Sequence, residues 1–152
     1  MGVTMQLPEA DRHTYTKSFL ETQVTVLMGG RVAEELFMKH MTSGASNDIE
    51  RATDIAQHMV CEWGMSDLGP LAYRKPGNAF DADRTHAVSE ATSQRVDEEI
   101  RKIVMRAYDH AKVIIESNRE SIRMLAEALL EQESLEADEI KALLVKSGAT
   151  GV

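Results

Sequence analysis

The chain contains a single cysteine, Cys61, among its 152 residues, so an internal disulfide is excluded. A lone cysteine suits a reducing compartment, and among apolar helical neighbours it is most simply a small buried hydrophobic residue. No apolar run approaches the roughly 20 residues that a membrane helix needs, and the first residues lack the apolar core of a signal peptide. We therefore expect a soluble, cytoplasmic chain.

Concentrated positive charge is also missing. The chain carries 17 Lys and Arg against 25 Asp and Glu, and its formal net charge is −8. Nucleic-acid binding needs a row of basic side chains that neutralise phosphates, and the sequence has no such row. We expect no nucleic-acid partner.

The usual signatures of a complete catalytic site are absent as well. The sequence has neither the Gly-rich phosphate loop GxxxxGK[ST] nor the nucleophile motif GxSxG. No two of the five histidines are three or four residues apart, so no helix brings two of them to one metal: His13, His40, His58, His86 and His110. We assign no catalytic or cofactor-binding residue from spacing alone.

Helical periodicity dominates what is present. The segment from Gly2 to Pro8 alternates apolar and polar residues and predicts a short strand. A helix is expected from about Thr16, with an interruption at Gly29-Gly30 and a resumption from Arg31 to Lys39. The front of the chain thus predicts one short strand followed by helix.

The remainder reads as helices separated by one long loop. An apolar stripe at helical spacing ends at Gly64 and consists of Ile49, Ala52, Ala56, Met59, Val60 and Trp63. Trp63 is therefore expected in the core. Residues 65–82 carry Gly and Pro turn signals and predict a partly mobile loop. Three helices follow. The first covers about residues 88–114, the second begins at a capping box at residues 117–120, and the third ends at a C-cap at Gly148. The prediction is an all-α fold, a helical bundle with at most a short N-terminal strand, forming one domain over residues 1–152.

Asp48 is the polar residue that least resembles an ordinary surface residue. It lies in the first turn of a predicted helix, where a carboxylate gains about 0.3–1 kcal/mol from the helix dipole. It also shares a helical row with Ala52, Ile55 and Met59, close to the apolar face. A carboxylate turned toward a core needs a cation, a metal or several donors. Spacing alone favours the helix-terminus role.

Three blocks of the sequence are distinctive: the segment from Gly2 to Pro8, the segment from Leu27 to Leu36 and above all Thr42-Ser43-Gly44-Ala45-Ser46-Asn47-Asp48 with the residues up to Thr53. These blocks resemble the FtsH family of membrane-anchored, ATP-dependent zinc proteases. Trp63-Gly64-Met65-Ser66 and Leu68-Gly69-Pro70-Leu71 continue the likeness in order. The resemblance implies a mainly helical peptidase domain.

In that family an HExxH helix supplies two histidine ligands and a glutamate base, and an aspartate supplies the third zinc ligand. The resemblance implies that Asp48 is this aspartate, and no other ligand has a match here. The HExxH helix, the ATPase module that uses ATP and the transmembrane helices are absent from the sequence. We therefore interpret the chain as a fragment, either cut from a longer protein or truncated, which alone binds no zinc and cleaves no peptide.

The resemblance also implies partners and a location. The complete enzyme acts as a hexamer on membrane and misfolded proteins at the cytoplasmic face of a bacterial inner membrane, which it reaches through the missing helices. The alternative is a non-catalytic helical interaction or oligomerisation domain derived from the family. In either role, we expect uncovered apolar surface to promote self-association.

Several further residues have two interpretations. Glu34 and Glu35 are expected to be a solvated pair, with the alternative that one orients a metal-binding histidine. The segment from Val3 to Gln6 is either a strand to which an unfolded substrate adds or a frayed terminus. His58 and His110 are expected to be solvated.

Overall fold

The computed structural model describes residues 14–38, 43–73 and 88–149. All regular structure in these ranges is helical, which confirms the all-α prediction. The elements in chain order are α1 (Lys17–Ala33), the π-helix η1 (Glu34–Met38), the 3-10 helix η2 (Ser43–Ala45), α2 (Ser46–Cys61), α3 (Glu90–Ser117), α4 (Arg119–Gln132) and α5 (Ala137–Ser147). The predicted N-terminal strand, and the part of the predicted loop from residue 74 onward, lie outside the described residues.

Helix α1 begins where the sequence predicts but does not break where it predicts. Thr16 is its N-cap, and the Thr16 hydroxyl accepts a hydrogen bond from the Phe19 N–H at 3.3 Å. The predicted interruption at Gly29-Gly30 is wrong, because α1 continues through both glycines to Ala33 and passes directly into η1. Glycine costs about 1 kcal/mol in a helix relative to alanine. Burial of Met28 and Val32 on either side of the pair offsets that cost.

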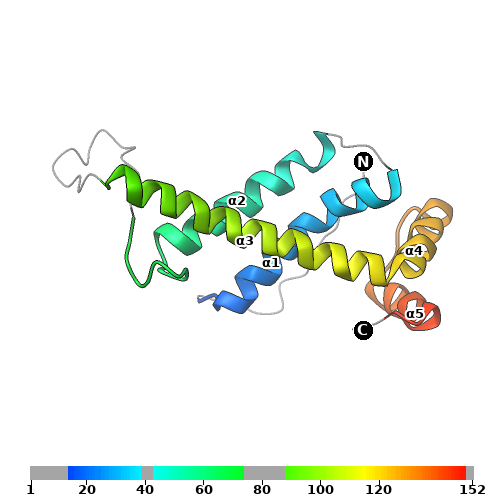
Figure 1. The fold of residues 1–152 in the computed structure, drawn as a ribbon. Coiled ribbons are helices and arrows are strands. Elements are labelled where there is room, and N and C mark those ends of the chain that lie inside the picture. The colour runs from blue at the N-terminus through cyan, green and yellow to red at the C-terminus, as the bar shows by residue number, and fades with distance from the viewer. Residues whose placement is uncertain (1–13, 39–42, 74–87, 150–152) are drawn as a thin grey trace.

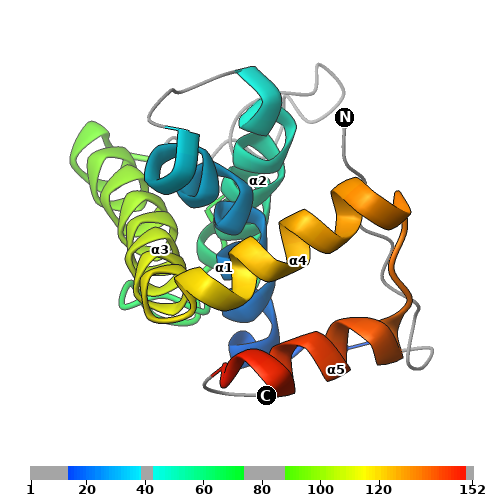
Figure 2. The ribbon, with the colours of Figure 1, turned by 90° about the vertical axis from the view of Figure 1, so that its right-hand side faces the viewer.

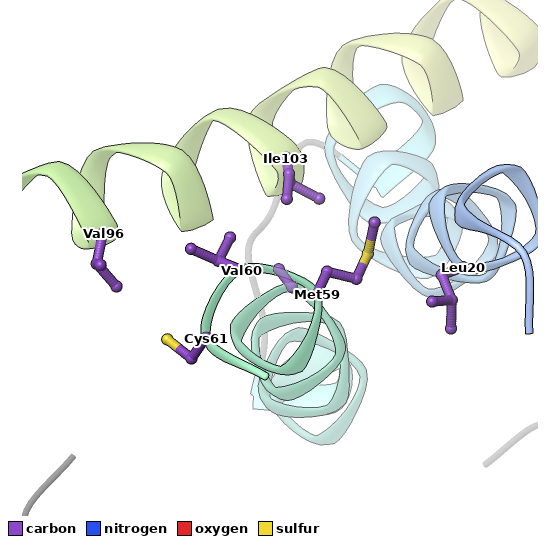
Figure 3. Close-up of a cluster of buried hydrophobic side chains, with 7 residues drawn as sticks. Leu20, Met59, Val60, Cys61, Val96 and Ile103 are labelled. Carbon is purple, nitrogen blue, oxygen red and sulfur yellow. The ribbon is translucent and has the colours of Figure 1, made fainter. Parts of the chain in front are cut away.

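Helices α1, α2 and α3 form the bundle that contains the core. Figure 1 shows the long helix α3 running across α1 and α2. A first buried cluster joins the start of α1 to the end of α2 and the first half of α3, as Figure 3 shows: Leu20, Ala56, Met59, Val60, Cys61, Val96 and Ile103. A second cluster lies further along: Val24, Met28, Val32, Ala52, Ala107 and Ala111. Because alanine side chains are short, the alanines of α2 and α3 in these clusters let the helix backbones approach closely.

The end of α2 differs from the prediction at one residue. Cys61 is buried, as expected, but Trp63 is 45% exposed and not part of the core. The reason is that α2 ends at Cys61, so the helical period no longer applies two residues later. Trp63 instead stacks on His58, with 5.5 Å between ring centroids, and His58 Nδ1 lies 3.0 Å from Glu62 Oε1.

The chain after α2 folds back on the bundle. Met65, Leu68 and Tyr73 pack against the first cluster. The Asp67 N–H donates to Glu99 Oε2 at 3.3 Å, and the Lys102 ammonium pairs with both carboxylates. The hydrogen bond from Lys102 holds the pKa of Asp67 below its usual value. This part of the predicted loop, up to residue 73, is therefore anchored to α3.

Helices α4 and α5 lie side by side at one end of α3 (Figure 2). The predicted capping box at residues 117–120 is wrong: Ser117 ends α3, and the Asn118 side chain donates back to the Ile114 carbonyl at 2.9 Å. A capping box occurs instead at the start of α5, between Glu136 and Glu139. Gly148 ends α5 with φ +73°, as predicted. None of the described helices has the length and apolar character needed to cross a membrane.

Candidate functional site

Asp48 lies in the first turn of α2, as the sequence predicts. The N-cap position of α2 is Ala45, whose side chain has no hydrogen-bonding atom, and the preceding residues form the short helix η2. Asp48 is the acidic residue of that first turn and is partly exposed. The partial positive charge of a helix N-terminus favours a carboxylate at this position.

Packing between α1 and α2 directs the Asp48 carboxylate toward α1. Ala52, one turn after Asp48, is fully buried in the second cluster, to which Val24, Met28 and Val32 of α1 also belong. At the neighbouring level of α1, a Cβ atom built on Gly30 would lie 3.6 Å from Asp48 Oδ2. Figure 1 shows the end of α1 and the start of α2 at the same end of the bundle. The buried alanine therefore sets the register that brings Asp48 against Gly30.

The Asp48 carboxylate has no competing partner among the residues that the structure describes. No hydrogen bond or ion pair joins it to another side chain in that part of the chain. Carboxylate oxygens are acceptors only, and each can bind a cation. Both oxygens of Asp48 thus remain available to a ligand.

Asp48 fits the role of one zinc ligand and does not complete a zinc site. Carboxylate oxygens bind zinc at about 2.0–2.2 Å, and catalytic zinc sites use three protein ligands. Across residues 14–38, 43–73 and 88–149, no group of three or more His, Cys, Asp or Glu side chains is placed to hold a metal ion. Any zinc site that includes Asp48 must draw its other ligands from outside these residues.

Glu35 is not a solvated residue, contrary to the expectation. Its Oε1 lies 3.1 Å from Arg31 Nη2, and its Oε2 accepts a hydrogen bond from the Tyr108 hydroxyl of α3. The side chains of Arg31 and Glu35 are only 18% and 25% exposed. The hydrogen bond to Glu35 is the main cause that raises the pKa of Tyr108. Glu34 is partly exposed, so the expectation of a solvated pair is wrong at Glu35.

Arg119 makes a second connection to η1 that sequence reasoning missed. Its Nη2 donates to the Leu36 carbonyl at 2.9 Å, and its guanidinium carbon lies 5.4 Å from the Phe37 ring centroid. Such cation–π contacts contribute about 0.5–1 kcal/mol at exposed sites. These partners are 83 residues apart, and no local pattern in a single sequence pairs residues at that distance.

His110 lies on α3 beside a groove between α1 and α3, and the residue is exposed, as expected. The groove has a volume of about 470 Å³ and is lined mainly by apolar atoms, including those of Val26, Ala111 and Ile114. Asp48 does not line it. The structure therefore does not bring His110 and Asp48 into one site.

Comparison with known proteins gives one consistent family. The model of Peptidase family M41 matches residues 1–143. A protein of Acidobacterium capsulatum named ATP-dependent zinc metalloprotease FtsH is 48% identical over 148 residues, which are 95% of this chain and 23% of the relative. The proteins of the same name from Magnetococcus marinus and Thermotoga maritima are 47% and 43% identical over 95% of the chain, and over 22% and 24% of their own lengths.

The chain therefore spans about a quarter of the length of these curated relatives. The family match covers the three resembling blocks and all of α1 to α4. The chain belongs to Peptidase family M41.

Proposed function

We propose that this chain is the part of an ATP-dependent zinc metalloendopeptidase that supplies Asp48 as the carboxylate ligand of the catalytic zinc. Membership of the peptidase family supports the reaction class, and the names of the relatives support the metal and the use of ATP. The observation that carries the assignment is the Asp48 carboxylate, which lies at the N-terminus of α2 with both oxygens available. The remaining zinc ligands and the ATPase module belong to sequence outside this chain.

Asp48 contributes position and charge to this chemistry. When bound, zinc activates a water molecule and polarises the scissile carbonyl. The backbone of Asp48 is held in place by α2, whose next turn is buried through Ala52, so the carboxylate is presented from the helix N-terminus. The negative charge is favoured there by the helix N-terminus. Because no group of three or more potential ligands is placed to hold a metal ion among the described residues, we expect the chain alone to retain no stoichiometric zinc and to cleave no peptide.

The finer properties of the whole enzyme follow from the same assignment. Its substrates are membrane and misfolded proteins, it assembles as a hexamer, and it works at the cytoplasmic face of a bacterial inner membrane. We assign membrane attachment and ATP hydrolysis to parts of the whole enzyme other than this chain, which spans 23% of its Acidobacterium capsulatum relative.

The proposal can be tested with an exchange protein, which is the Acidobacterium capsulatum relative with its matching segment replaced by this chain. The measurements are the zinc content per subunit and the ATP-dependent hydrolysis of casein. We expect one zinc per subunit and activity. Asp48→Asn should lower zinc affinity by more than about 100-fold, since even residues that only orient a ligand change it by 10–100-fold. Asp54→Asn, an exposed aspartate of the same helix, is the matched control and should change neither quantity.

Two outcomes would contradict the proposal. If Asp48→Asn behaves like Asp54→Asn, Asp48 acts only at the helix terminus. If the exchange protein folds and hydrolyses ATP yet contains no zinc, this chain does not supply a ligand. Metal analysis of the 152-residue chain alone is an independent check, because one tightly held zinc per chain would contradict the incomplete ligand set.

A non-catalytic interaction domain is the second candidate, and exposed apolar residues favour it. Leu130 of α4 is 85% exposed and Val145 of α5 is 71% exposed. Large apolar side chains on a surface often mark contacts with other chains. This candidate predicts an exchange protein that assembles normally without zinc or protease activity, whereas the metalloprotease assignment requires all three.

A further inference from the structure

The two neighbouring glycines of α1 have different surroundings. A Cβ atom added to Gly29 would meet nothing within 4 Å, whereas one added to Gly30 would lie 3.6 Å from Asp48 Oδ2. Both residues are inside a continuous helix, where each costs about 1 kcal/mol relative to alanine. Gly30 is exposed and lies near the Asp48 carboxylate, whereas Gly29 is partly exposed and lines the groove beside His110.

Packing alone does not demand a glycine at position 30. A separation of 3.6 Å is an ordinary van der Waals contact, and Gly30 has no positive φ that other residues avoid. The helix itself would gain stability from alanine at this position. The property that a side chain would remove is therefore the open space beside Asp48 Oδ2.

The backbone at Gly30 is held firmly enough that a new side chain would act on the carboxylate. Met28 and Val32, on either side, are 3% and 1% exposed. Arg31, the next residue, is bound to Glu35, and Glu35 accepts the hydrogen bond from Tyr108 of α3. These contacts hold the end of α1 and η1 against α3. Ala52 of α2 is buried in the same cluster as Met28 and Val32, and this packing holds α1 against α2.

We propose that Gly30 is a positioning residue for the metal ligand: its bare backbone leaves Asp48 Oδ2 uncovered for a cation and for the other groups that bind this cation. The proposal rests on the proposed function, in which Asp48 binds zinc. A metal bound about 2 Å from a carboxylate oxygen needs its remaining ligands within a few ångströms of the same point. A methyl group on residue 30 would border that space, and a branched side chain would extend into it.

Matched substitutions in the exchange protein test this role. We expect Gly29→Ala and Gly30→Ala to raise the unfolding temperature by similar amounts, because both gain the same helix propensity. Zinc affinity should stay unchanged in Gly29→Ala and fall by roughly twofold to tenfold in Gly30→Ala. Gly30→Val should lower it by about 10–100-fold, as removal of groups that orient a metal ligand does. Gly29→Val is the control for the lower helix propensity of valine.

Replacing zinc with Co²⁺ gives a spectroscopic measurement that does not depend on the stability of the protein. With Co²⁺ in place of zinc, the visible absorption bands report the geometry of the ligands. The bands should shift in Gly30→Ala and Gly30→Val and stay in place in the Gly29 variants. Circular dichroism identifies any variant that does not fold. If a valine variant does not fold, the comparison of Gly29→Ala with Gly30→Ala tests the role of Gly30, because a Cβ atom 3.6 Å from Asp48 Oδ2 fits without a clash.

Each result has one meaning. Equal zinc affinity and equal cobalt spectra for the Gly29 and Gly30 variants would overturn the role of Gly30. Equal losses in both valine variants would overturn it too, because helix propensity would then account for them. Loss of zinc in the Gly30 variants together with full zinc binding in Asp48→Asn would instead contradict the proposed function, so the two failures are distinguishable.

Discussion

At the scale of single residues, Glu35 shows how strongly partners change the role of a side chain. The solvated glutamate expected at this position is instead bound by Arg31 and Tyr108. Hydrogen bonds to charged groups contribute about 1.5–3 kcal/mol, more than bonds between neutral groups. The connection between η1 and α3 therefore depends on one hydroxyl group and one carboxylate.

We expect Tyr108→Phe to lower the free energy of unfolding by about 1–2 kcal/mol, because it removes the hydroxyl donor and leaves Glu35 paired with Arg31. Urea titration followed by circular dichroism measures the change. Tyr15→Phe is the control: Tyr15 is 49% exposed and stacks on Phe19 through its ring, so its loss of a hydroxyl should cost less than about 0.5 kcal/mol. Equal effects of the two variants would show that the Tyr108 bond contributes nothing to the fold.

The same pair of residues predicts a dependence on pH. The hydrogen bond to Glu35 raises the pKa of Tyr108, so folding favours the neutral phenol. This contribution is complete below the unfolded pKa of about 10 and is lost as the pH rises through the folded pKa. The difference in unfolding free energy between the unsubstituted chain and Tyr108→Phe should therefore be constant from neutral pH to about pH 9 and shrink above about pH 10. A difference that grows at high pH would contradict the assigned donor.

At the scale of elements, Gly64 and Gly69 lie in the segment between α2 and residue 73, and the conformation of this segment constrains Gly64 more than Gly69. Gly64 has φ +59°, and a Cβ atom there would lie 2.6 Å from the Pro70 Cα atom. Gly69 has φ +86°, but a Cβ atom there would meet nothing within 4 Å. The first glycine is thus required by both conformation and space, and the second by conformation alone.

Gly69→Ala should cost about 1–2 kcal/mol, the strain of a left-handed conformation for a residue with a side chain. Gly64→Ala should cost more, because the backbone of Pro70 must also move away. Thermal unfolding of the two variants checks the order. Equal costs would show that the turn shifts without loss and that the close approach is not a constraint.

At the scale of the whole molecule, burial is unequally distributed. Among the residues that the structure describes, the buried apolar ones all belong to α1, η2, α2 and α3, whereas Ser121 is the one buried residue of α4 and α5. These two helices are joined by the hydrogen bond from the Ser147 hydroxyl to Ser121 Oγ at 2.7 Å. They contact the rest mainly at the end of α3 and through Arg119 (Figure 2).

We expect α4 and α5 to open at a lower free energy than α1–α3, because regions with few buried apolar contacts open locally. Native-state hydrogen exchange with mass spectrometry should show faster exchange for residues 119–147 than for the helical residues up to 61 and from 96 to 111. Equal protection in both regions would contradict this expectation and would mean that the described helices open together.

Local rules explain what could be predicted from the sequence about this protein. The 3.6-residue period identified the helices, the start near Thr16 and most of the buried faces. Capping chemistry identified Gly148, and the first-turn position of Asp48 followed from the turn residues before it. These features depend on neighbours within a few residues along the chain. The resemblance to a family then indicated the role of Asp48, which periodicity alone did not.

Tertiary structure decided the rest, because the free energies involved arise between residues far apart in sequence. Burial of Met28 and Val32 carried α1 through two glycines that local propensity marks as a break. Tyr108 turned Glu35 from a solvated residue into a bound one. Docking of α2 on α1 brought the Asp48 carboxylate against Gly30, a contact that no pattern in either helix specifies by itself.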